Sequence, residues 1–411
     1  MDKSMKSYFS KLILVLATVC LIIVGAPCNA IGNNQNDLSF DKDGLFKIMV
    51  IADVQDGANV SRYTIDLIEK SIEQEDPDLV VFNGDNIFGL SPSLLLSPDN
   101  IRKSIDQFTK PIIDNNIPFV VVFGNHDGQT IMKESDQLDY YQSLPGNLTE
   151  RGTVDKRLGT FNLPIYGDNS TPELNLWFFH SGDWAITEYG LGYAYVLDEQ
   201  IEWYESKNDE LKNANEGQNV PSVVFQHMAV PEIYELLKEV DADTEGAIKG
   251  TGKHSHQYFV LDSASAIDGT LNEGPCPPDY NNGEFDSWVE QGDVMAAVFG
   301  HDHINDFRGV YEGIELIYTP GVGFYSYGNG YQHGVRVMEF DVNDVENYGT
   351  RMIYYDDLIN DPIPQELLYD GAFMRGDVYI YITLGCVLIF VITISVIYVV
   401  RKKRQRKTEI V

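Results

Sequence analysis

The chain has 411 residues and is strongly acidic, with 62 Asp and Glu against 29 Lys and Arg. Its formal net charge of −33 repels polyanions, which argues against DNA or RNA as a partner. A hydrophobic content of 44% excludes a disordered chain and predicts one large domain or two modest ones.

The first 30 residues have the pattern of a cleaved secretory signal. A basic start precedes an apolar run from Leu12 to Gly25, and the small residue Ala30 follows. Three later sequons fit a glycosylated secretory protein, at Asn59, Asn147 and Asn169. Beyond the signal, and apart from Cys386 near the C-terminus, Cys276 is the one cysteine, so we expect no disulfide in this part of the chain.

Short apolar runs alternate with amphipathic segments between residues 46 and 345, which favours an α/β fold. One helix is predicted to end at Asp76-Pro77, with Ile65, Ile68 and Ile72 on one face. A second is predicted to start at Ser97-Pro98 and to bury Ile101, Ile105 and Phe108. We expect Pro111 to kink or end this helix. A third is predicted after Pro231, with an inner face of Ile233, Leu236, Leu237 and Val240.

Five of the predicted strands end in residues that can bind a metal ion. The runs FKIMVIA, LVVFNG, PFVVVFG, SVVFQ and MAAVFG lead to Asp53, Asp85, Asn125-His126-Asp127, His227 and His301-Asp302-His303. A single Asp or His in such a place is more often a cap or a hydrogen-bonded structural residue. Ligand sites of α/β sheets lie beyond the carboxyl ends of strands, so five such ends together predict a functional centre. The remaining histidines lack this support and are expected to be structural or substrate-side: His180, His254, His256 and His333.

Residues 379–400 carry no charge, and this length is about what a helix needs to cross a bilayer. Six basic residues in 401–411 follow, which favours a cytoplasmic tail. The pattern predicts a single-pass type I membrane protein of the secretory pathway, with residues 31–378 extracellular or lumenal. Without the three lysines before residue 30, the six basic tail residues, Asp2 and Glu409, that segment has 20 basic and 60 acidic residues and a net charge of −40.

The strand-end motifs resemble the signature of the calcineurin-like metallophosphoesterase superfamily. The matching residues are Asp53-Val-Gln55, Gly84-Asp85, Gly124-Asn-His-Asp127, His227 and Gly300-His-Asp-His303. The resemblance covers about residues 46–345. The strings GDNIFG, HMAVPE and GVGFYSYG are similar to the purple acid phosphatase-like branch, which includes plant members and a yeast protein phosphatase.

The resemblance implies a four-layer αββα sandwich with a two-metal centre, to which the sequence adds a C-terminal transmembrane helix. One divalent ion would be held by Asp53, Gln55, Asp85 and His303, and the other by Asp85, Asn125, His227 and His301. His126 would stabilise the phosphoryl charge and could protonate the leaving group, and Asp127 would orient His126. The metals could be Mn, Fe, Zn or Mg.

Two positions depart from the pattern. Phe88 stands where purple acid phosphatases have the tyrosinate that binds ferric iron, so we expect no purple colour. Gln55 stands where His is usual; an amide oxygen is a harder ligand, which should weaken that metal position or shift its preference towards Mn or Mg without abolishing it.

The predicted function is a metal-dependent phosphatase acting on phosphomonoesters or phosphoproteins, through a hydroxide activated by two metals. One alternative is a phosphodiesterase acting on nucleotides or lipids. A further alternative is a non-catalytic phosphate-binding ectodomain. Residues 128–222 and 243–282 are expected to contain the loops that shape the substrate pocket.

Overall fold

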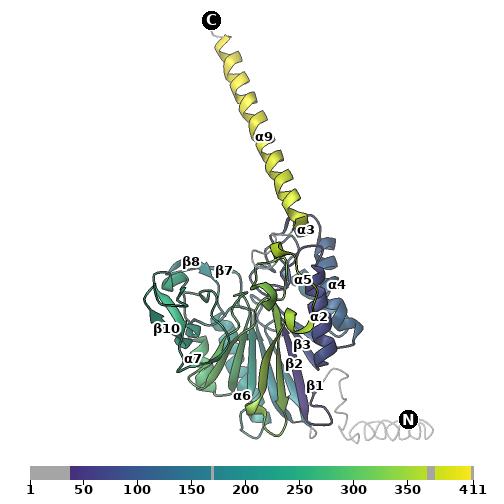
Figure 1. The fold of residues 1–411 in the computed structure, drawn as a ribbon, viewed down its shortest axis with the longest axis vertical. Helices are drawn as coiled ribbons and strands as arrows, with labels where there is room; N and C mark the ends of the chain where they lie inside the picture. The colour runs from purple at the N-terminus through teal and green to yellow at the C-terminus, as the bar shows by residue number, and fades with distance from the viewer. Residues whose placement is uncertain (1–37, 168–170, 368–374, 409–411) are drawn as a thin grey trace, which may run out of the picture. The chain divides into compact units, whose positions relative to one another are not determined.

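A computed structural model describes residues 38–167, 171–367 and 375–408 (Figure 1). The predicted signal at residues 1–30 and the sequon at Asn169 lie outside these ranges. Cys276 is a free thiol, as the sequence predicts.

One sheet of the structure has five strands. These are β2 (Leu45–Ile51), β3 (Leu79–Asn83), β4 (Phe119–Val122), β17 (Gly334–Asp341) and β18 (Gly349–Tyr354). Their order across the sheet is β18-β17-β2-β3-β4. Because β2, β3 and β4 run parallel, their carboxyl ends lie at the same edge of the sheet.

A second sheet has eight strands. They are β1 (Leu38–Ser39), β5 (Phe161–Tyr166), β6 (Pro172–Phe179), β9 (Ser222–Gln226), β13 (Ala266–Asp268), β14 (Val294–Phe299), β15 (Arg308–Tyr311) and β16 (Ile314–Tyr318). Their order is β1-β5-β6-β9-β14-β16-β15-β13. The central strands β6, β9, β14 and β16 are parallel, so this sheet also gathers carboxyl ends at one edge.

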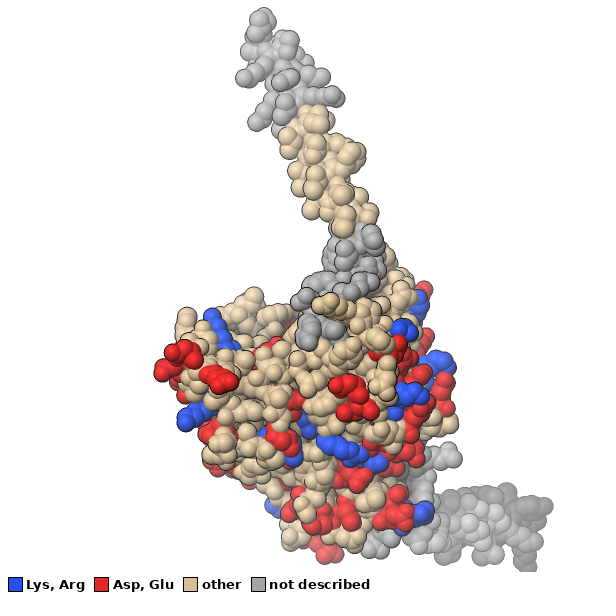
Figure 2. Space-filling view, in the orientation of Figure 1, with Lys and Arg blue, Asp and Glu red and all other residues tan. Residues whose placement is uncertain are grey.

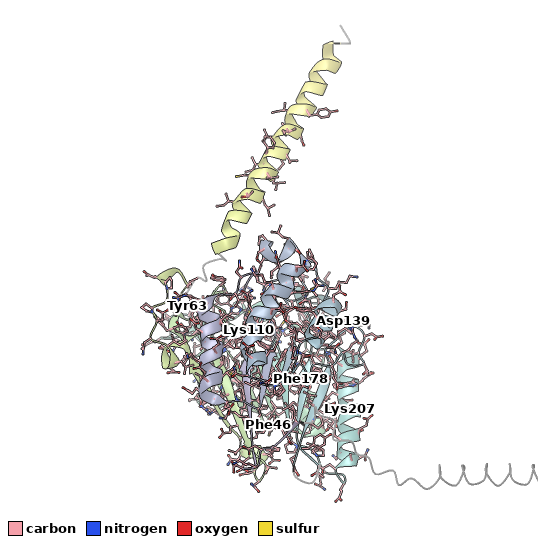
Figure 3. The ribbon with its side chains drawn as sticks, turned by 90° about the vertical axis from the view of Figure 1, so that its right-hand side faces the viewer. Phe46, Tyr63, Lys110, Asp139, Phe178 and Lys207 are labelled. Carbon is pink, nitrogen blue, oxygen red and sulfur yellow. The ribbon has the colours of Figure 1, made fainter. Side chains whose placement is uncertain are left out.

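The two sheets face each other across a buried apolar layer. Ile48 and Val50 of β2 point into this layer, and Phe178 and Phe225 meet them from the other sheet. Figure 3 labels Phe46 and Phe178, which both belong to the layer. Since side chains alternate along a strand, the neighbouring residues of β2 point to the opposite face of the sheet.

Helices cover the outer face of each sheet. On the five-stranded sheet, α2 (Arg62–Glu75) and α4 (Pro98–Asp114) share a buried cluster with Met49 and Phe82. On the eight-stranded sheet, Tyr204 of α6 (Asp198–Ala214) and Trp288 of α7 (Glu284–Gln291) pack in one cluster with Trp177 and Phe299. The predicted α/β fold is confirmed, and its layers run helix, sheet, sheet, helix.

Shorter elements complete the described part of the chain. Two small sheets consist of β10 (Leu237–Val240), β11 (Ile248–Lys249) and β12 (Tyr258–Leu261), and of the hairpin β7 (Trp184–Thr187) and β8 (Gly190–Tyr193). The short α-helices are α3 (Pro92–Leu95), α5 (Glu134–Gln142) and α8 (Tyr355–Leu358). The 3₁₀ helices are η1 (Pro231–Leu236), η2 (Gly252–His254), η3 (Gly330–Gln332), η4 (Val345–Asn347) and η5 (Gln365–Leu367).

One helix prediction is wrong, and at Pro111 the helix does not end. The segment after Pro231 forms only η1, because Leu237–Val240 pairs with Tyr258–Leu261 as antiparallel strands. Helix α4 continues past Pro111 to Asp114. Proline removes one backbone donor, but Pro111 is within the last turn, is buried, and has its own carbonyl bonded by Asn115 Nδ2 at 2.8 Å.

The segment predicted to span a membrane is helical, within α9 (Arg375–Thr408). Across the described ranges, however, no helix combines the length and apolarity needed to cross a bilayer. The structure therefore supports a helix over residues 379–400 and does not support the span.

Candidate metal centre

The five strand ends singled out by the sequence meet at one edge of the two sheets. Asn83, the last residue of β3, joins the sheets there. Its Nδ2 donates to the carbonyl oxygens of Gln226 at 3.2 Å and Val298 at 3.0 Å. Because Gln226 and Val298 belong to β9 and β14, Asn83 holds the ends of three ligand-bearing strands together.

Four residues at these ends have left-handed backbone conformations that are rare for residues with side chains. The φ angles are 52° for Asp53, 41° for Gln55, 48° for Asp85 and 73° for His301. Such conformations store strain and persist where surrounding contacts determine the backbone. Here the Asp53 N–H donates to Gly84 O at 3.1 Å, and the Gln55 N–H donates to Asp85 O at 3.0 Å. The backbone is therefore held in the shape that directs these side chains into the site.

Two motif glycines are required by close packing around Asp85 and His227. A Cβ on Gly84, which has a φ of +92°, would lie 2.4 Å from the His227 ring. A Cβ on Gly124 would lie 2.3 Å from the backbone nitrogen of Asp85. Any side chain at either position would displace a predicted ligand.

One group of predicted ligands is already assembled. Ligand atoms of Asp85, His227 and His301 all lie within 4.8 Å of one another, and the three residues are buried. Asp85 Oδ2 is 3.1 Å from His227 Nε2. Asn125 is 2% exposed, and its Oδ1 has no hydrogen-bond partner within the described part of the chain. An acceptor buried beside this cluster without a donor fits a cation ligand.

The second group joins Asp53 and His303. Asp53 Oδ1 lies 3.3 Å from His303 Nε2 and has no hydrogen-bond partner in the ranges described. The other Asp53 oxygen accepts from the His301 N–H at 3.0 Å. His303 Nδ1 lies 2.9 Å from Ser326 Oγ and 3.1 Å from the Tyr327 carbonyl oxygen. These contacts on Nδ1 leave Nε2 of His303 directed at Asp53, as a metal-binding histidine requires.

Gln55 lies between the two groups. Its Nε2 donates to Asp85 Oδ2 at 3.2 Å, and its Oε1 accepts from Ser326 Oγ. The amide nitrogen rather than the oxygen faces the shared carboxylate. To offer Oε1 to a cation beside Asp85, the amide group has to rotate by half a turn, and Ser326 can then accept instead of donate.

Charges within the centre interact strongly. Burial alone would raise the pKa of Asp85, but the charges of His227 and His126 hold it below its ordinary value. Burial would lower the pKa of His227, but the carboxylates of Asp85 and Asp53 raise it to about 10. Burial, with the nearby charge of Asp85, raises the pKa of Asp127 to about 8. Carboxylates buried this closely need positive charge beside them.

His126 sits next to Asn125 and faces the same centre. Its side chain is 24% exposed, and its Nε2 is 4.0 Å from Asp85 Oδ2. Its Nδ1 is 2.8 Å from Gln129 Oε1, and Gln129 Nε2 donates to Asp183 Oδ1 at 2.7 Å. The Nε2 side of the imidazole thus faces the centre, whereas its Nδ1 side is held by Gln129.

The structure corrects the role predicted for Asp127. Its Oδ1 accepts from the N–H groups of Asn86 at 3.1 Å and Ile87 at 3.2 Å, and its Oδ2 accepts from the Gly124 N–H at 2.7 Å. Asp127 therefore fixes the loops that follow β3 and β4, and Gln129 is the partner of His126. Gln129 is one turn from His126 in the sequence, but no pattern indicates Asp183.

Aromatic residues that sequence reasoning missed flank the ligands. Tyr327 stacks on His303 with a centroid distance of 4.2 Å and an interplanar angle of 5°. Tyr193, at the end of β8, meets His301 edge-on at 4.5 Å. Ser326 and Tyr327 lie in the string GVGFYSYG, whose similarity to the family was the available signal. Nothing in the sequence around Tyr193 indicates its position.

The four remaining histidines do not join the described ligand groups. Burial lowers the pKa of His180 and of His333 to about 3, so both are neutral. His254 stacks on Tyr234 at 4.0 Å, and His256 is exposed. The prediction of structural roles fits these surroundings.

Two of the three sequons, Asn59 and Asn147, lie in the described ranges. Asn59 is exposed, and its Oδ1 accepts from Lys103 Nζ at 2.6 Å. Asn147 is half-buried, and its Nδ2 donates to Thr149 Oγ1 at 3.2 Å. Glycosylation at these positions stays a prediction.

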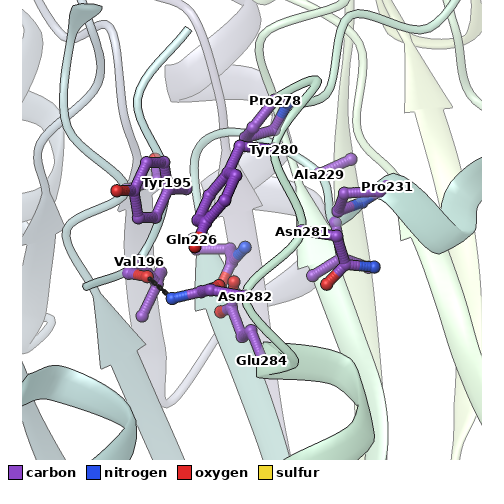
Figure 4. Close-up of a pocket in the computed structure, with 12 residues that line it drawn as sticks. Tyr195, Val196, Gln226, Ala229, Pro231, Pro278, Tyr280, Asn281, Asn282 and Glu284 are labelled. Carbon is purple, nitrogen blue, oxygen red and sulfur yellow. Dashed lines mark hydrogen bonds between the residues drawn. The ribbon is translucent and has the colours of Figure 1, made fainter. Parts of the chain in front are cut away.

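A small cavity lies at the carboxyl end of β9, with Gln226 in its lining. Figure 4 shows Tyr195, Gln226, Tyr280, Asn282 and Glu284 around it. Burial, together with the charge of Glu232, raises the pKa of Glu284 well above its ordinary value. A carboxyl group whose pKa is raised in this way is neutral, and none of the seven predicted ligands lines this cavity.

The residues present fit two divalent cations. The donor set combines carboxylate, amide and imidazole, which suits Mn, Fe, Zn or Mg. The lone acceptors Asp53 Oδ1 and Asn125 Oδ1 belong to the two different predicted ligand sets, and Gln55 Nε2 bonds the Asp85 carboxylate that both sets share. All seven predicted ligand side chains are buried at this one edge: Asp53, Gln55, Asp85, Asn125, His227, His301 and His303.

Comparison with known proteins agrees with this geometry. The model of the calcineurin-like phosphoesterase family matches residues 46–305, more than half of the chain. Two Arabidopsis thaliana proteins, named "Probable inactive purple acid phosphatase 14" and "Probable inactive purple acid phosphatase 29", are 28% and 29% identical. These alignments cover 82% and 80% of this chain, and 86% and 84% of the plant proteins.

A yeast relative carries a different name. The Saccharomyces cerevisiae "Phosphatase DCR2" is 24% identical over 74% of this chain and 52% of its own length. The relatives thus include proteins named as inactive and one named as a phosphatase, so the question of catalysis turns on the residues of this chain.

Proposed function

The chain belongs to the calcineurin-like phosphoesterase family, and we propose that it is an active metal-dependent phosphatase that hydrolyses phosphomonoesters. One observation carries the proposal: Asp85 and Asp53 both lie within 4 Å of His227 Nε2, and the partly exposed His126 has its Nε2 4.0 Å from Asp85 Oδ2. A family member that had lost catalysis would be expected to lack several ligands or the histidine.

The residues divide the work. When bound, two divalent cations supply Lewis acidity to the phosphate and activate the attacking water. Asp53 and Asp85 provide the negative charge that retains the cations. His126 holds a proton at Nδ1 through Gln129, and its Nε2 faces the centre. When Nε2 is also protonated, it would donate to the transferring phosphoryl group and supply the leaving oxygen with that proton.

The names of the plant relatives favour the competing function, a non-catalytic phosphate-binding domain. The test is turnover by the purified full chain loaded with Mn, Fe, Zn or Mg, using p-nitrophenyl phosphate and the diester bis(p-nitrophenyl) phosphate. We expect the monoester to be preferred. A chain that carries two metals and hydrolyses neither ester would make the site non-catalytic, and preference for the diester would make the protein a phosphodiesterase.

We also propose that the catalytic domain is lumenal or extracellular and that residues 379–400 anchor it. The support is the sequence pattern of signal, uncharged segment and basic tail, together with exposed apolar side chains on α9 between Ile382 and Tyr398. Protease added to sealed vesicles from expressing cells tests this arrangement. Cleavage of the tail and the domain from the same side would contradict it.

A further inference from the structure

Exposed apolar side chains gather on the loops around the metal centre. Four segments form this border: residues 86–98 after β3, residues 128–133 after β4, the β7–β8 hairpin, and residues 319–333 after β16. We call six of their exposed apolar residues the apolar rim: Leu96, Ile131, Trp184, Ile186, Leu191 and Tyr327. In Figure 1, α3 and the hairpin both lie toward the top of the domain.

Each segment of the rim contacts the centre directly. The rings of Phe88 and His126 are 5.1 Å apart, and Gln129 bonds His126. Tyr193 of the hairpin and Tyr327 pack on the ligands His301 and His303. The segments that carry the apolar rim are therefore also segments that contact the centre, and Tyr327 belongs to both.

The hairpin tip is the most exposed part of the rim. Ile186 is 85% exposed and Leu191 is 74% exposed. At the base of the hairpin, Trp184 stacks on Tyr193 at 4.7 Å with an interplanar angle of 18°. The apolar tip is thus supported by a stack of rings that reaches the ligand His301.

The rim is almost uncharged on a protein that is otherwise strongly acidic. Residues 86–98 and 319–333 contain no Asp, Glu, Lys or Arg, whereas residues 128–133 contain the exposed Lys133 and the hairpin contains Glu188. Figure 2 shows red and blue side chains over the lower part, the right side and the upper left edge of the domain, with tan surface between them toward the top. An exposed apolar patch bordering a binding site marks what that site binds.

We propose that the apolar rim binds the hydrocarbon part of an amphiphilic phosphoester at a lipid surface, so that its phosphate reaches the metal centre. This inference rests on the proposed function and adds a substrate class to it. The cation ligands and the rim match the two halves of such a molecule, an anionic phosphate and an apolar chain.

The charge distribution favours a lipid surface over a polar soluble ester. Nucleotides and sugar phosphates need donors and acceptors beside the phosphate, and the rim offers few. The acidic remainder of the domain is repelled by an anionic membrane, so the domain approaches a bilayer most easily through the uncharged rim. Trp and Tyr are also the residues that favour the interface of a bilayer.

Tryptophan fluorescence tests the contact independently of activity. Of the four tryptophans, Trp184 is 51% exposed, whereas Trp177 and Trp288 are buried and Trp203 is half-buried. The full chain is reconstituted in vesicles of phosphatidylcholine with brominated or ordinary acyl chains. We expect bromine to quench the wild-type emission, and Trp184→Phe to lose most of this quenching. Equal quenching in the two proteins, or none in the wild type, would overturn the contact.

Substrate preference gives the second test. The substrates are long-chain phosphatidic acid in phosphatidylcholine vesicles and soluble dibutyryl phosphatidic acid. The double variant Ile186→Asp, Leu191→Asp should lower the ratio of kcat/KM for vesicles to kcat/KM for the soluble substrate by about tenfold or more. The reason is that two apolar side chains, which would be buried in the lipid on binding, are replaced by charged ones. The control, Ile267→Asp with Val310→Asp, changes exposed residues of β13 and β15 and should leave the ratio unchanged.

The outcomes separate this inference from the proposed function. An unchanged ratio in the hairpin variant, while p-nitrophenyl phosphate is still hydrolysed, rejects only the lipid surface. Reduced turnover of phosphorylated casein with unchanged turnover of vesicles would assign the rim to a protein and also reject it. If the metal-loaded wild type does not hydrolyse p-nitrophenyl phosphate, the proposed function is rejected, whatever the fluorescence result.

Discussion

The imidazole Nδ1 of His126 lies 2.8 Å from Oε1 of Gln129. Because Gln129 Nε2 donates to Asp183, its oxygen is the acceptor in this pair, and His126 carries its proton on Nδ1. The tautomer leaves Nε2 of His126 facing Asp85 and the space where a phosphate would bind. Gln129 is thus a positioning residue for His126.

Replacing Gln129 by Leu should lower kcat by about 10- to 100-fold with little change in KM, since the binding groups remain and only the orientation of His126 is lost. The loss should be larger for alkyl phosphates than for p-nitrophenyl phosphate, because an alkoxide needs a proton to leave and p-nitrophenolate does not. Steady-state kinetics on both esters measure this difference.

A matched control lies elsewhere in the chain. Gln257 repeats the arrangement, with its Oε1 2.7 Å from His254 Nδ1 and its Nε2 donating to Glu239 at 2.9 Å. Gln257→Leu should leave both esters unaffected. Equal losses on the two esters in Gln129→Leu would contradict a role through His126.

His126→Ala should retain both metal ions and lose most turnover. The imidazole of His126 bonds Gln129, and its backbone N–H donates to Asp85 Oδ1 at 2.7 Å, a bond that alanine keeps, so the cation ligands stay in place. General acid catalysis and charge stabilisation of this kind contribute about 10²- to 10⁴-fold. Metal analysis and turnover are measured on the same preparation, and loss of a metal ion would show that His126 is a ligand.

Gln55 should act as a weak ligand. Gln55→His should bind the first metal more tightly, since imidazole needs no rotation of an amide, and Gln55→Ala should raise the metal requirement about 10- to 100-fold while activity recovers at high Mn. Asp85→Asn removes a charge that both groups share, and excess metal should not rescue it. Metal titrations of the three variants test this order, and full activity of Gln55→Ala at low metal would remove Gln55 from the ligand set.

An iron-loaded protein should lack the visible tyrosinate-to-iron band. Phe88 packs edge-on against His126 at 5.1 Å, and a phenyl ring cannot bind iron. An absorption spectrum of the iron-loaded chain measures this directly. A strong band would mean that another tyrosine near the centre, such as Tyr193 or Tyr327, binds the metal.

His333 should make the fold less stable in mild acid. Burial lowers its pKa from 6.5 to about 3, so between these values the unfolded chain takes up a proton that the folded chain does not. The free energy of unfolding therefore falls as pH drops below 6.5, by about 2 kcal/mol from this residue between pH 7 and pH 5.

His333→Gln should remove this pH-dependent part of the stability change. Glutamine can still donate to Gly321 O, the partner of His333 Nδ1 at 3.2 Å, but does not titrate. Urea unfolding at pH 7 and pH 5 gives the change, and the exposed His256→Gln serves as the control. The same loss of stability in wild type and His333→Gln would contradict the assignment.

The sequence by itself determined the ligand-bearing edge. Asp53, Asp85, Asn125, His227 and His301 each follow an apolar run, and parallel strands must place their carboxyl ends together. The local sequence is sufficient to predict this edge, because a buried strand and the residue that follows it are neighbours in the chain. Helix starts are local in the same way: Ser61 and Ser97, the N-caps of α2 and α4, directly precede the helices that they cap.

Only the tertiary structure decided which distant residues serve those ligands. Asp183 reaches Gln129 across 54 positions, and the carbonyl oxygens that Asn83 bonds are 143 and 215 positions away, so no periodicity links them. The segment Leu237–Val240 has helical spacing of apolar residues but pairs with β12, because strand hydrogen bonds to a distant segment outweigh a weak local preference. Sequence patterns fix which face of an element is buried, whereas the partner that buries it is chosen by the packing of the whole chain.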